Sequence, residues 1–168
     1  VSNLVTFDAH DPRVQNAVPL MGFDSLRPAY QVLKKMLGSF PDLVVDRDDF
    51  MVISPDEGAL DRNMFYASVM EVEMGMFYKR RDYSRVVDGR NPIVAHEYLG
   101  SDVAGKAVFV ADDIISSGES MLDIAYNVKE RRAKSFFAFA TYSIFTNGLA
   151  ALIRPMRRAS STVSLAPT

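Results

Sequence analysis

Residues 108–123 read VFVADDIISSGESMLD, and this stretch sets the order strand, loop, helix. Its first four residues are apolar and predict a buried strand, at whose carboxyl end Asp112 and Asp113 stand side by side. Apolar residues at helical spacing then predict a helix over residues 119–132; they are Leu122, Ala125, Tyr126 and Val128. The stretch therefore predicts a strand that runs through an acidic loop into a helix.

The loop in this stretch contains Ser116, Ser117 and Gly118. Free backbone N–H groups, serine hydroxyls and the positive end of a helix dipole favour a bound phosphate. The two carboxylates before the loop accept hydrogen bonds from sugar hydroxyls or hold Mg²⁺. Together these groups suit a sugar phosphate. A plain strand end followed by a serine helix cap is the alternative interpretation of the same residues.

A short strand is expected over residues 4–7, and Asp8 and His10 follow at its end. A carboxylate and an imidazole two residues apart can converge on a metal ion or a nucleotide phosphate. A surface turn with an exposed histidine is the alternative. A helix is expected next over residues 28–37, with its core side formed by Tyr30, Leu33, Met36 and Leu37.

A second buried strand is expected over residues 50–53, followed by an acidic turn and a helix over residues 59–70. Arg62 lies near the start of that helix, where its guanidinium could bind a diphosphate through two hydrogen bonds. A solvated surface arginine is the alternative. Two strand–turn–helix units of this kind place their loops at one edge of a parallel sheet, facing a common crevice.

A third strand over residues 74–78 is expected to deliver Lys79, Arg80 and Arg81 into a polar segment at residues 82–91. Such cations can close over a polyphosphate and stabilise charge during transfer, or they can simply face solvent. A further strand is expected over residues 136–141. The alternation of strands and helices predicts an α/β fold with a mostly parallel sheet flanked by helices.

The composition fits one globular domain, because the chain has 168 residues, of which 48% are hydrophobic and 24% charged. A net charge of −2 gives no general attraction to nucleic acid or to an anionic membrane. The absence of cysteine excludes disulfides, thiolate zinc sites and a cysteine nucleophile. No apolar run approaches the roughly 20 residues of a membrane span. We therefore expect a cytoplasmic protein without nucleic-acid or membrane partners.

Four segments, in colinear order, resemble the carboxyl-terminal half of the ribose-phosphate diphosphokinases, also called phosphoribosyl pyrophosphate synthetases. They are FDAH from Phe7, ISPDEGALDR from Ile53, YKRR from Tyr78 and VADDIISSGES from Val110. The resemblance covers roughly residues 4–149. It implies a type I phosphoribosyltransferase-like domain over residues 1–150.

The resemblance also implies a role for each polar group. The implied metal ligands are Asp8, His10, Asp112 and Asp113, and the last two would also bind the ribose hydroxyls. The implied pyrophosphate loop contains Asp56, Glu57, Gly58 and Arg62. The implied 5-phosphate loop contains Ser116, Ser117, Gly118, Glu119 and Ser120. The implied catalytic cations are Lys79 and Arg81.

Several positions depart from the family pattern. In the 5-phosphate loop Ser116, Ser117, Glu119 and Ser120 stand where the common pattern has Asp, Thr, Gly and Thr. In the pyrophosphate loop Glu57 replaces a small residue and Ala59 a glycine. Serine keeps the hydroxyl of threonine. A carboxylate at position 119 suits the helix dipole if it points outward and repels a phosphate if it points inward.

The implied reaction transfers the diphosphoryl group of Mg-ATP to O1 of ribose 5-phosphate, giving phosphoribosyl pyrophosphate and AMP. Family members carry a second domain of the same architecture ahead of this one, and homo-oligomers are expected of the full-length protein. We expect this chain to keep the sugar-phosphate site and to turn over weakly or not at all. Two alternatives stay open: a phosphoribosyltransferase that consumes phosphoribosyl pyrophosphate, and a non-catalytic regulatory homologue.

Residues 151–168 depart from the family pattern, and we interpret them as an aberrant tail. A single-base frameshift is our hypothesis for its origin, which resequencing of the gene would test. On this interpretation the domain lacks its last helix and strand. The sheet would then have an uncovered edge near Phe136.

Overall fold

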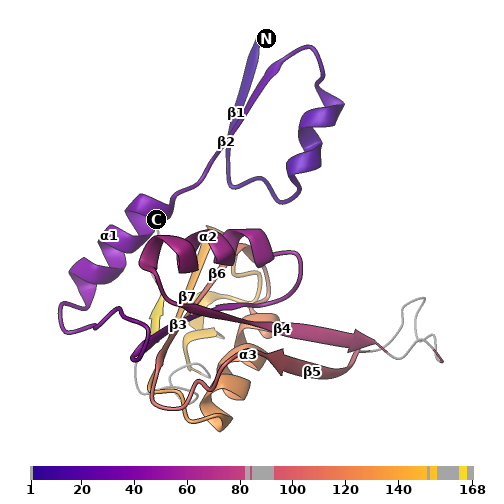
Figure 1. The fold of residues 1–168 in the computed structure, drawn as a ribbon. Coiled ribbons are helices and arrows are strands. Elements are labelled where there is room, and N and C mark those ends of the chain that lie inside the picture. The colour runs from indigo at the N-terminus through magenta and orange to yellow at the C-terminus, as the bar shows by residue number, and fades with distance from the viewer. Residues whose placement is uncertain (1, 82–83, 85–92, 151, 155–162, 166–168) are drawn as a thin grey trace.

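The computed structural model describes residues 2–81, 84, 93–150, 152–154 and 163–165 (Figure 1). Its main body is a six-stranded sheet with the strand order β5-β4-β3-β6-β7-β8, and a separate two-stranded sheet pairs β1 with β2. The elements are β1 (Asn3–Phe7), the 3-10 helix η1 (Pro12–Ala17), β2 (Gly22–Leu26), α1 (Ala29–Ser39), β3 (Phe50–Ser54), α2 (Leu60–Met70), β4 (Glu73–Arg81), β5 (Ile93–Leu99), β6 (Ala107–Ile115), α3 (Glu119–Glu130), β7 (Ser135–Ser143) and β8 (Val163–Leu165).

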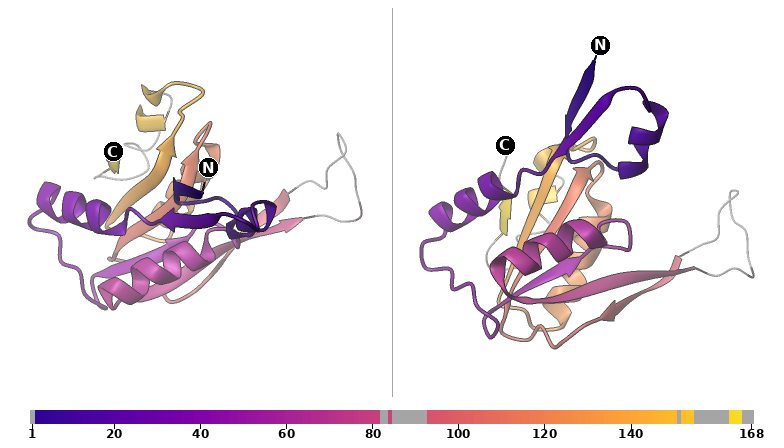
Figure 2. Two further views of the ribbon diagram at one scale, coloured as in Figure 1. Left: turned by 90° about the horizontal axis from the view of Figure 1, so that it is seen from above. Right: turned by 45° about the horizontal axis from the view of Figure 1, so that its top comes forward.

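The six-stranded sheet is parallel except at β5, which pairs antiparallel with β4. Side chains alternate between its two faces, as a strand requires. On β6, Val108 and Val110 pack in the core that contains α3, whereas Phe109 and Ala111 pack in the core that contains α1 and α2. Helices therefore cover both faces of the sheet (Figures 1 and 2), which confirms the predicted fold class.

The predicted helices exist, but their buried faces differ from those expected. On α1 the side chains of Tyr30 and Leu37 are 70% and 46% exposed. Of the expected core residues, Met36 is buried and Leu33 packs against the core, and Ala29 and Val32 complete the buried stripe. On α3 the expected core residues Ala125 and Val128 are buried, whereas Tyr126 is exposed. In both helices aliphatic and methionine side chains lie against the sheet and a tyrosine ring is left at the surface, because the close packing of helix on sheet decides the rotation of the helix.

The strand β4 continues through Arg81, three residues beyond the predicted strand end at Tyr78. Lys79 is paired with His96 and Arg80 with Ala95, which makes this basic segment part of an antiparallel ladder. The side chains of Lys79 and Arg81, and the expected polar segment at residues 82–91 except for residue 84, lie outside the described part of the structure.

The sheet edge near Phe136 is paired, contrary to the expectation of an open edge. The strand β8 runs parallel to β7 in a register from Phe136↔Val163 to Ala138↔Leu165. Leu152 belongs to the main core, where it is 1% exposed. Residues 152 and 163–165 are therefore part of the fold. None of the helices in the described segments is both long and apolar enough to cross a membrane.

The β1–β2 unit projects away from the six-stranded sheet (Figures 1 and 2). Its two strands are parallel, in a register from Asn3↔Gly22 to Phe7↔Leu26. Apolar side chains on both strands remain exposed, with Val5 at 57% and Phe7 at 54%. Since parallel sheets are normally covered on both faces, this unit is the least covered part of the described fold.

Candidate active site

The chain path places a crevice between the carboxyl ends of β3 and β6. From β3 the chain passes through α2 to β4, on one side of the sheet centre, and from β6 it passes through α3 to β7, on the other side. The pairing of the two strands runs only from Phe50↔Ala107 to Val52↔Phe109, after which their ends separate. Ligands of open α/β sheets bind at such a topological switch point.

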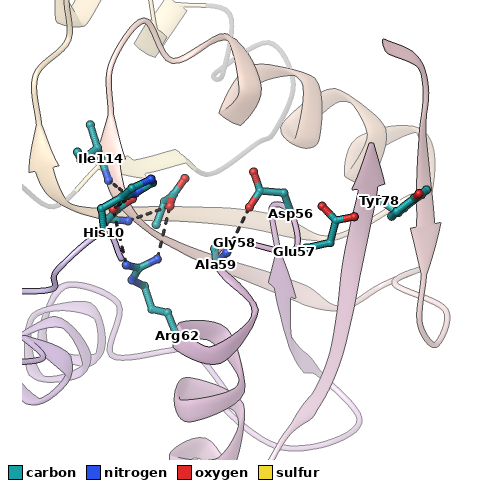
Figure 3. Close-up of a pocket in the computed structure, with 10 residues that line it drawn as sticks. His10, Asp56, Glu57, Gly58, Ala59, Arg62, Tyr78 and Ile114 are labelled. Atoms are coloured by element: carbon teal, nitrogen blue, oxygen red, sulfur yellow. Dashed lines mark hydrogen bonds and ion pairs between the residues drawn. The ribbon is translucent and has the colours of Figure 1, made fainter. Parts of the chain in front are cut away.

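A cavity of about 550 Å³ lies at this point (Figure 3). It is lined by His10, Asp56, Glu57, Gly58, Ala59, Arg62, Tyr78, Asp112, Asp113 and Ile114. All four segments that carry the family resemblance therefore contribute to one cavity. The acidic pair lies within β6, which continues to Ile115, and it faces the loop after β3 across this cavity, as the shared crevice predicted.

Arg62 forms the centre of an ion-pair network in the cavity. Its Nε lies 3.1 and 2.9 Å from the two carboxylate oxygens of Asp8. Its Nη1 is 3.5 Å from Oδ1 of Asp112, and its Nη2 is 3.9 Å from Oδ2 of Asp113. The side chain is 12% exposed. The guanidinium expected to bind a diphosphate is thus engaged by carboxylates.

Asp8 adopts a left-handed backbone conformation, with φ at 45°. Its side chain is buried, and Oδ2 also accepts a hydrogen bond of 2.7 Å from the hydroxyl of Thr141. The Asp8 carboxylate therefore accepts hydrogen bonds from the Arg62 guanidinium and the Thr141 hydroxyl, and it does not line the cavity. Together with a 2.8 Å hydrogen bond from the Tyr142 hydroxyl to the Phe7 carbonyl, these contacts attach the β1–β2 unit to the main sheet.

His10 contacts Asp113 through a 2.6 Å hydrogen bond between Nδ1 and Oδ2. The imidazole is largely exposed, whereas the Asp113 side chain is 6% exposed. The hydrogen bond to Asp113, and the negative charge of that carboxylate, raise the pKa of His10. Burial favours protonation of Asp113, but hydrogen bonds from Asp112 and His10 outweigh it and lower the pKa of Asp113.

Asp112 behaves in the opposite way to its neighbour. Burial raises its pKa to about 7, and the hydrogen bond that its protonated form makes with Asp113 acts in the same direction. Near neutral pH Asp113 is therefore ionised, whereas Asp112 is partly protonated. A ligand that brings positive charge to this pair, such as a metal complex, would favour ionisation of both.

The oxygen donors of Asp112 and Asp113 suit Mg²⁺, which prefers carboxylates together with water and phosphate oxygens. Asp8, also expected as a ligand, is held by Arg62 instead. In the described segments, no group of three or more His, Asp or Glu side chains is arranged to hold a metal ion. Asp112 and Asp113 therefore suit a Mg²⁺ ion that binds together with a phosphate ligand, which supplies further oxygen ligands.

A second cavity of about 140 Å³ adjoins the first, sharing Asp112 and Ile114 with it. It is lined by Asp112, Ile114, Ile115, Ser116, Ser117, Gly118, Ser120 and Met121. Glu119 is not among these residues, and its side chain is exposed. Its carboxylate therefore leaves the loop free for an anion, and it lies at the first turn of α3, where the helix dipole favours it.

Gly118 in this loop cannot be replaced without strain. Its φ is +87°, and an added Cβ would lie 2.7 Å from Cδ1 of the buried Leu152. We expect Gly118→Ala to lower the free energy of unfolding by about 1–3 kcal/mol, because the left-handed conformation and the close contact both oppose a side chain. Chemical denaturation measures this loss. The same substitution in a Leu152→Ala background should cost less, and an unchanged cost would contradict the contact.

The loop after β3 is ordered by its own polar groups. The hydroxyl of Ser54 donates to the carbonyl of Asp56 at 2.7 Å, and Oδ1 of Asp56 accepts from the N–H of Ala59 at 3.2 Å. Glu57 and Gly58, which lie between Asp56 and Ala59 in the sequence, line the cavity. The loop therefore presents backbone and carboxylate groups on the side of the crevice opposite Asp112.

No role was predicted from the sequence for two residues in or beside the crevice. Tyr78 lines the cavity from β4, although in its segment a role was predicted only for the cations that follow it. Asn63 lies on the buried face of α2 and is inaccessible to solvent. A polar residue on the apolar face of a predicted helix is the signal that could have drawn attention to it.

Comparison with known proteins assigns most of the chain to one domain family. The family described as "Phosphoribosyl transferase domain" matches residues 26–148. The chain is 31% identical over 147 residues to the ribose-phosphate pyrophosphokinase of Thermococcus kodakarensis, covering 86% of this chain and 46% of that protein. It is 30% identical over 154 residues to the enzyme of the same name from Pasteurella multocida, covering 89% and 44%. The chain thus spans about half the length of these curated relatives.

Solved structures show the same fold. A phosphoribosylpyrophosphate synthetase from Mycobacterium smegmatis matches with a TM-score of 0.73 at 20% identity, over 98% of this chain and 48% of that one. An adenine phosphoribosyltransferase matches with a TM-score of 0.53 at 17% identity, over 82% and 75%. The fold expected from the sequence resemblance is therefore confirmed.

Proposed function

This chain belongs to the phosphoribosyl transferase domain family, and on that premise we propose that it is the sugar-phosphate half of a ribose-phosphate pyrophosphokinase. The observation that carries the proposal is the pair of loops at the switch point. The carboxylates Asp112 and Asp113 stand beside a small cavity suited to a 5-phosphate, and the loop at residues 56–59 faces them across the larger cavity. This arrangement suits a ribose 5-phosphate that extends toward a diphosphate.

In the proposed reaction, O1 of ribose 5-phosphate attacks the β-phosphorus of ATP. A bond forms between O1 and Pβ, the bond from Pβ to the oxygen bridging it to Pα breaks, and O1 loses its proton to water; the products are phosphoribosyl pyrophosphate and AMP. Asp112 and Asp113 orient the ribose hydroxyls, and the serine loop holds the 5-phosphate. Bound Mg²⁺ would supply charge neutralisation at the transferring diphosphoryl group, aided by the catalytic cations Lys79 and Arg81.

The chain spans about half the length of its ribose-phosphate pyrophosphokinase relatives, and the β1–β2 unit that carries His10 toward the cavity has open faces. We propose that ATP is held with a further domain, in a homo-oligomer of the full-length protein. Production of AMP by this chain alone at the rate of a full-length enzyme would contradict that division.

Calorimetric titration tests the sugar-phosphate site directly. We expect ribose 5-phosphate and phosphoribosyl pyrophosphate to bind, the latter with Mg²⁺, and the double variant Asp112→Ala, Asp113→Ala to weaken both by about a hundredfold or more, since charge-assisted hydrogen bonds are lost. Asp48 and Asp49 form a matched control, because they are also adjacent carboxylates but lie exposed before β3, at the far end of that strand. Equal affinities in the two double variants would overturn the assignment.

Two other functions would give different results in the same assay. A phosphoribosyltransferase would bind phosphoribosyl pyrophosphate and need an acceptor base in place of ATP. A regulatory homologue would bind nucleotide or partner without Mg²⁺-dependent chemistry. Adding ATP, or a purine base, to the ribose-phosphate complex and following AMP or pyrophosphate release separates these possibilities from the proposed reaction.

A further inference from the structure

Asn63 is a buried polar side chain on α2 with no part in the proposed chemistry. Its Nδ2 donates hydrogen bonds of 2.8 Å to the carbonyls of Ala59 and Ala111, and its Oδ1 accepts from the N–H of Ala111 at 3.0 Å. The side-chain amide thus pairs with both backbone groups of one residue. A neighbouring β-strand would make the same pair of contacts.

Ala111 lies where β6 has separated from β3. The β3–β6 pairing ends at Val52↔Phe109, whereas β3 remains paired with β4 as far as Ser54↔Met76. Asn63 therefore takes the place of the missing strand, reaching β6 from a helix. The next residue along β6 is Asp112, and the residue before Asn63 is Arg62, so the amide lies between two groups of the site.

The helix that carries Asn63 begins directly after the loop at residues 56–59. Its hydrogen bonds to Ala111 therefore connect that loop to the carboxylates on the opposite side of the crevice. We propose that Asn63 is a positioning residue that sets the width of this crevice by fixing α2 to the end of β6. The choice of phosphoribosyl pyrophosphate and ribose 5-phosphate as test ligands rests on the proposed function.

A ligand that contacts both sides of the crevice depends on its width more than a ligand held at one side. Phosphoribosyl pyrophosphate has a 5-phosphate and ribose for the β6 side and a diphosphate for the β3 side, whereas ribose 5-phosphate needs the β6 side alone. We expect Asn63→Leu, which keeps the approximate volume and removes the hydrogen bonds, to weaken phosphoribosyl pyrophosphate about tenfold or more, and ribose 5-phosphate less than about threefold.

Met36→Ala serves as the control for a general loss of stability. Met36 is buried on α1 in the same core that α2 covers, and it does not line the cavity. A merely structural role of Asn63 predicts that both variants weaken the two ligands in equal proportion. That result, or unchanged affinity of Asn63→Leu for both ligands, would overturn the inference.

Hydrogen exchange in the ligand-free protein tests the contact itself. In Asn63→Leu the amide of Ala111 should exchange about tenfold faster or more, while the amide of Phe109, earlier on the same strand, keeps its protection. Uniform acceleration of both amides, as expected for Met36→Ala, would contradict the inference. If the unmodified protein bound neither sugar phosphate, the proposed function would fail, and the exchange at Ala111 would still decide whether Asn63 fixes α2 to β6.

Discussion

Arg62→Ala is expected to lower the free energy of unfolding by about 3–5 kcal/mol, because it leaves the buried Asp8 carboxylate without its ionic partner. Arg62 Nε contacts both oxygens of Asp8, and the two side chains are 12% and 7% exposed. A hydrogen bond from Thr141 remains, but a hydroxyl does not compensate a buried charge. Urea denaturation of the purified protein measures the change.

A double variant separates the ion pair from the packing of the arginine stem. Asp8→Asn removes the charge, so Arg62→Ala should cost less in an Asp8→Asn background than in the unmodified protein. Arg13→Ala is the control, because Arg13 pairs with Asp11 at the surface, where 83% of its side chain is exposed. Loss of that solvent-exposed pair should leave the free energy of unfolding nearly unchanged.

The loss should begin at the β1–β2 unit, since Asp8 ends its first strand. Amides of β1 and β2 should lose protection against hydrogen exchange in Arg62→Ala before those of the six-stranded sheet do. A loss of less than about 1 kcal/mol, with protection of β1 and β2 unchanged, would show that the Asp8 carboxylate is stable without the guanidinium.

The positions of the site loops at the edge of the sheet could be predicted from the sequence, because each loop follows directly from a local pattern of residues. An apolar run, two carboxylates and a serine loop follow one another at residues 108–120, and a strand of this kind must end at the edge of the sheet. The grouping of Asp112 with the loop after β3 then followed from the parallel topology. The local residue pattern and the parallel topology together were sufficient to predict that Asp112 and the loop after β3 lie close together.

The contacts between distant segments could not be predicted in the same way. The Asp8–Arg62 pair joins residues 54 positions apart, and it depends on a left-handed backbone at Asp8 that no local pattern signals. Asn63 likewise meets Ala111 only because β3 and β6 separate after Phe109. The rotation of α1, which buries Val32 and exposes Tyr30, was decided by packing against the sheet.

Asp112→Asn is expected to stabilise the ligand-free protein above neutral pH and to weaken the proposed binding of phosphoribosyl pyrophosphate. Burial raises the pKa of Asp112 to about 7, well above the value of a carboxyl group in an unfolded chain. Between pH 4 and 7 the folded state therefore holds a proton that the unfolded state releases. Stability contributed by Asp112 falls as pH rises through this range, and the asparagine removes that loss.

The pH dependence of the difference in stability between the two proteins has the sign expected of Asp112 and not that of its neighbour. Asp113 has a lowered pKa, so its contribution to stability is lost as pH falls, which is the opposite sign. Denaturation of both proteins from pH 4 to 8 should show equal stability near pH 4 and a gain of about 2 kcal/mol for Asp112→Asn at pH 8, because the side chain is 26% exposed and solvent screens part of the shift.

Affinity should change in the opposite direction to stability. Asparagine keeps the shape of Asp112 but has one acceptor oxygen in place of two and no charge for a Mg²⁺-bound phosphate ligand, so phosphoribosyl pyrophosphate should bind about a hundredfold more weakly. Asp48→Asn, at an exposed carboxylate away from the cavity, should change neither the affinity nor the stability.

An Asp112→Asn protein that lost affinity without gaining stability at pH 8 would mean that Arg62, 3.5 Å away, already compensates the ionised carboxylate. A gain in stability with affinity retained would exclude Asp112 from the binding site. The predicted combination, greater stability with weaker binding, is the result expected of a carboxylate whose burial serves its ligand and not the fold.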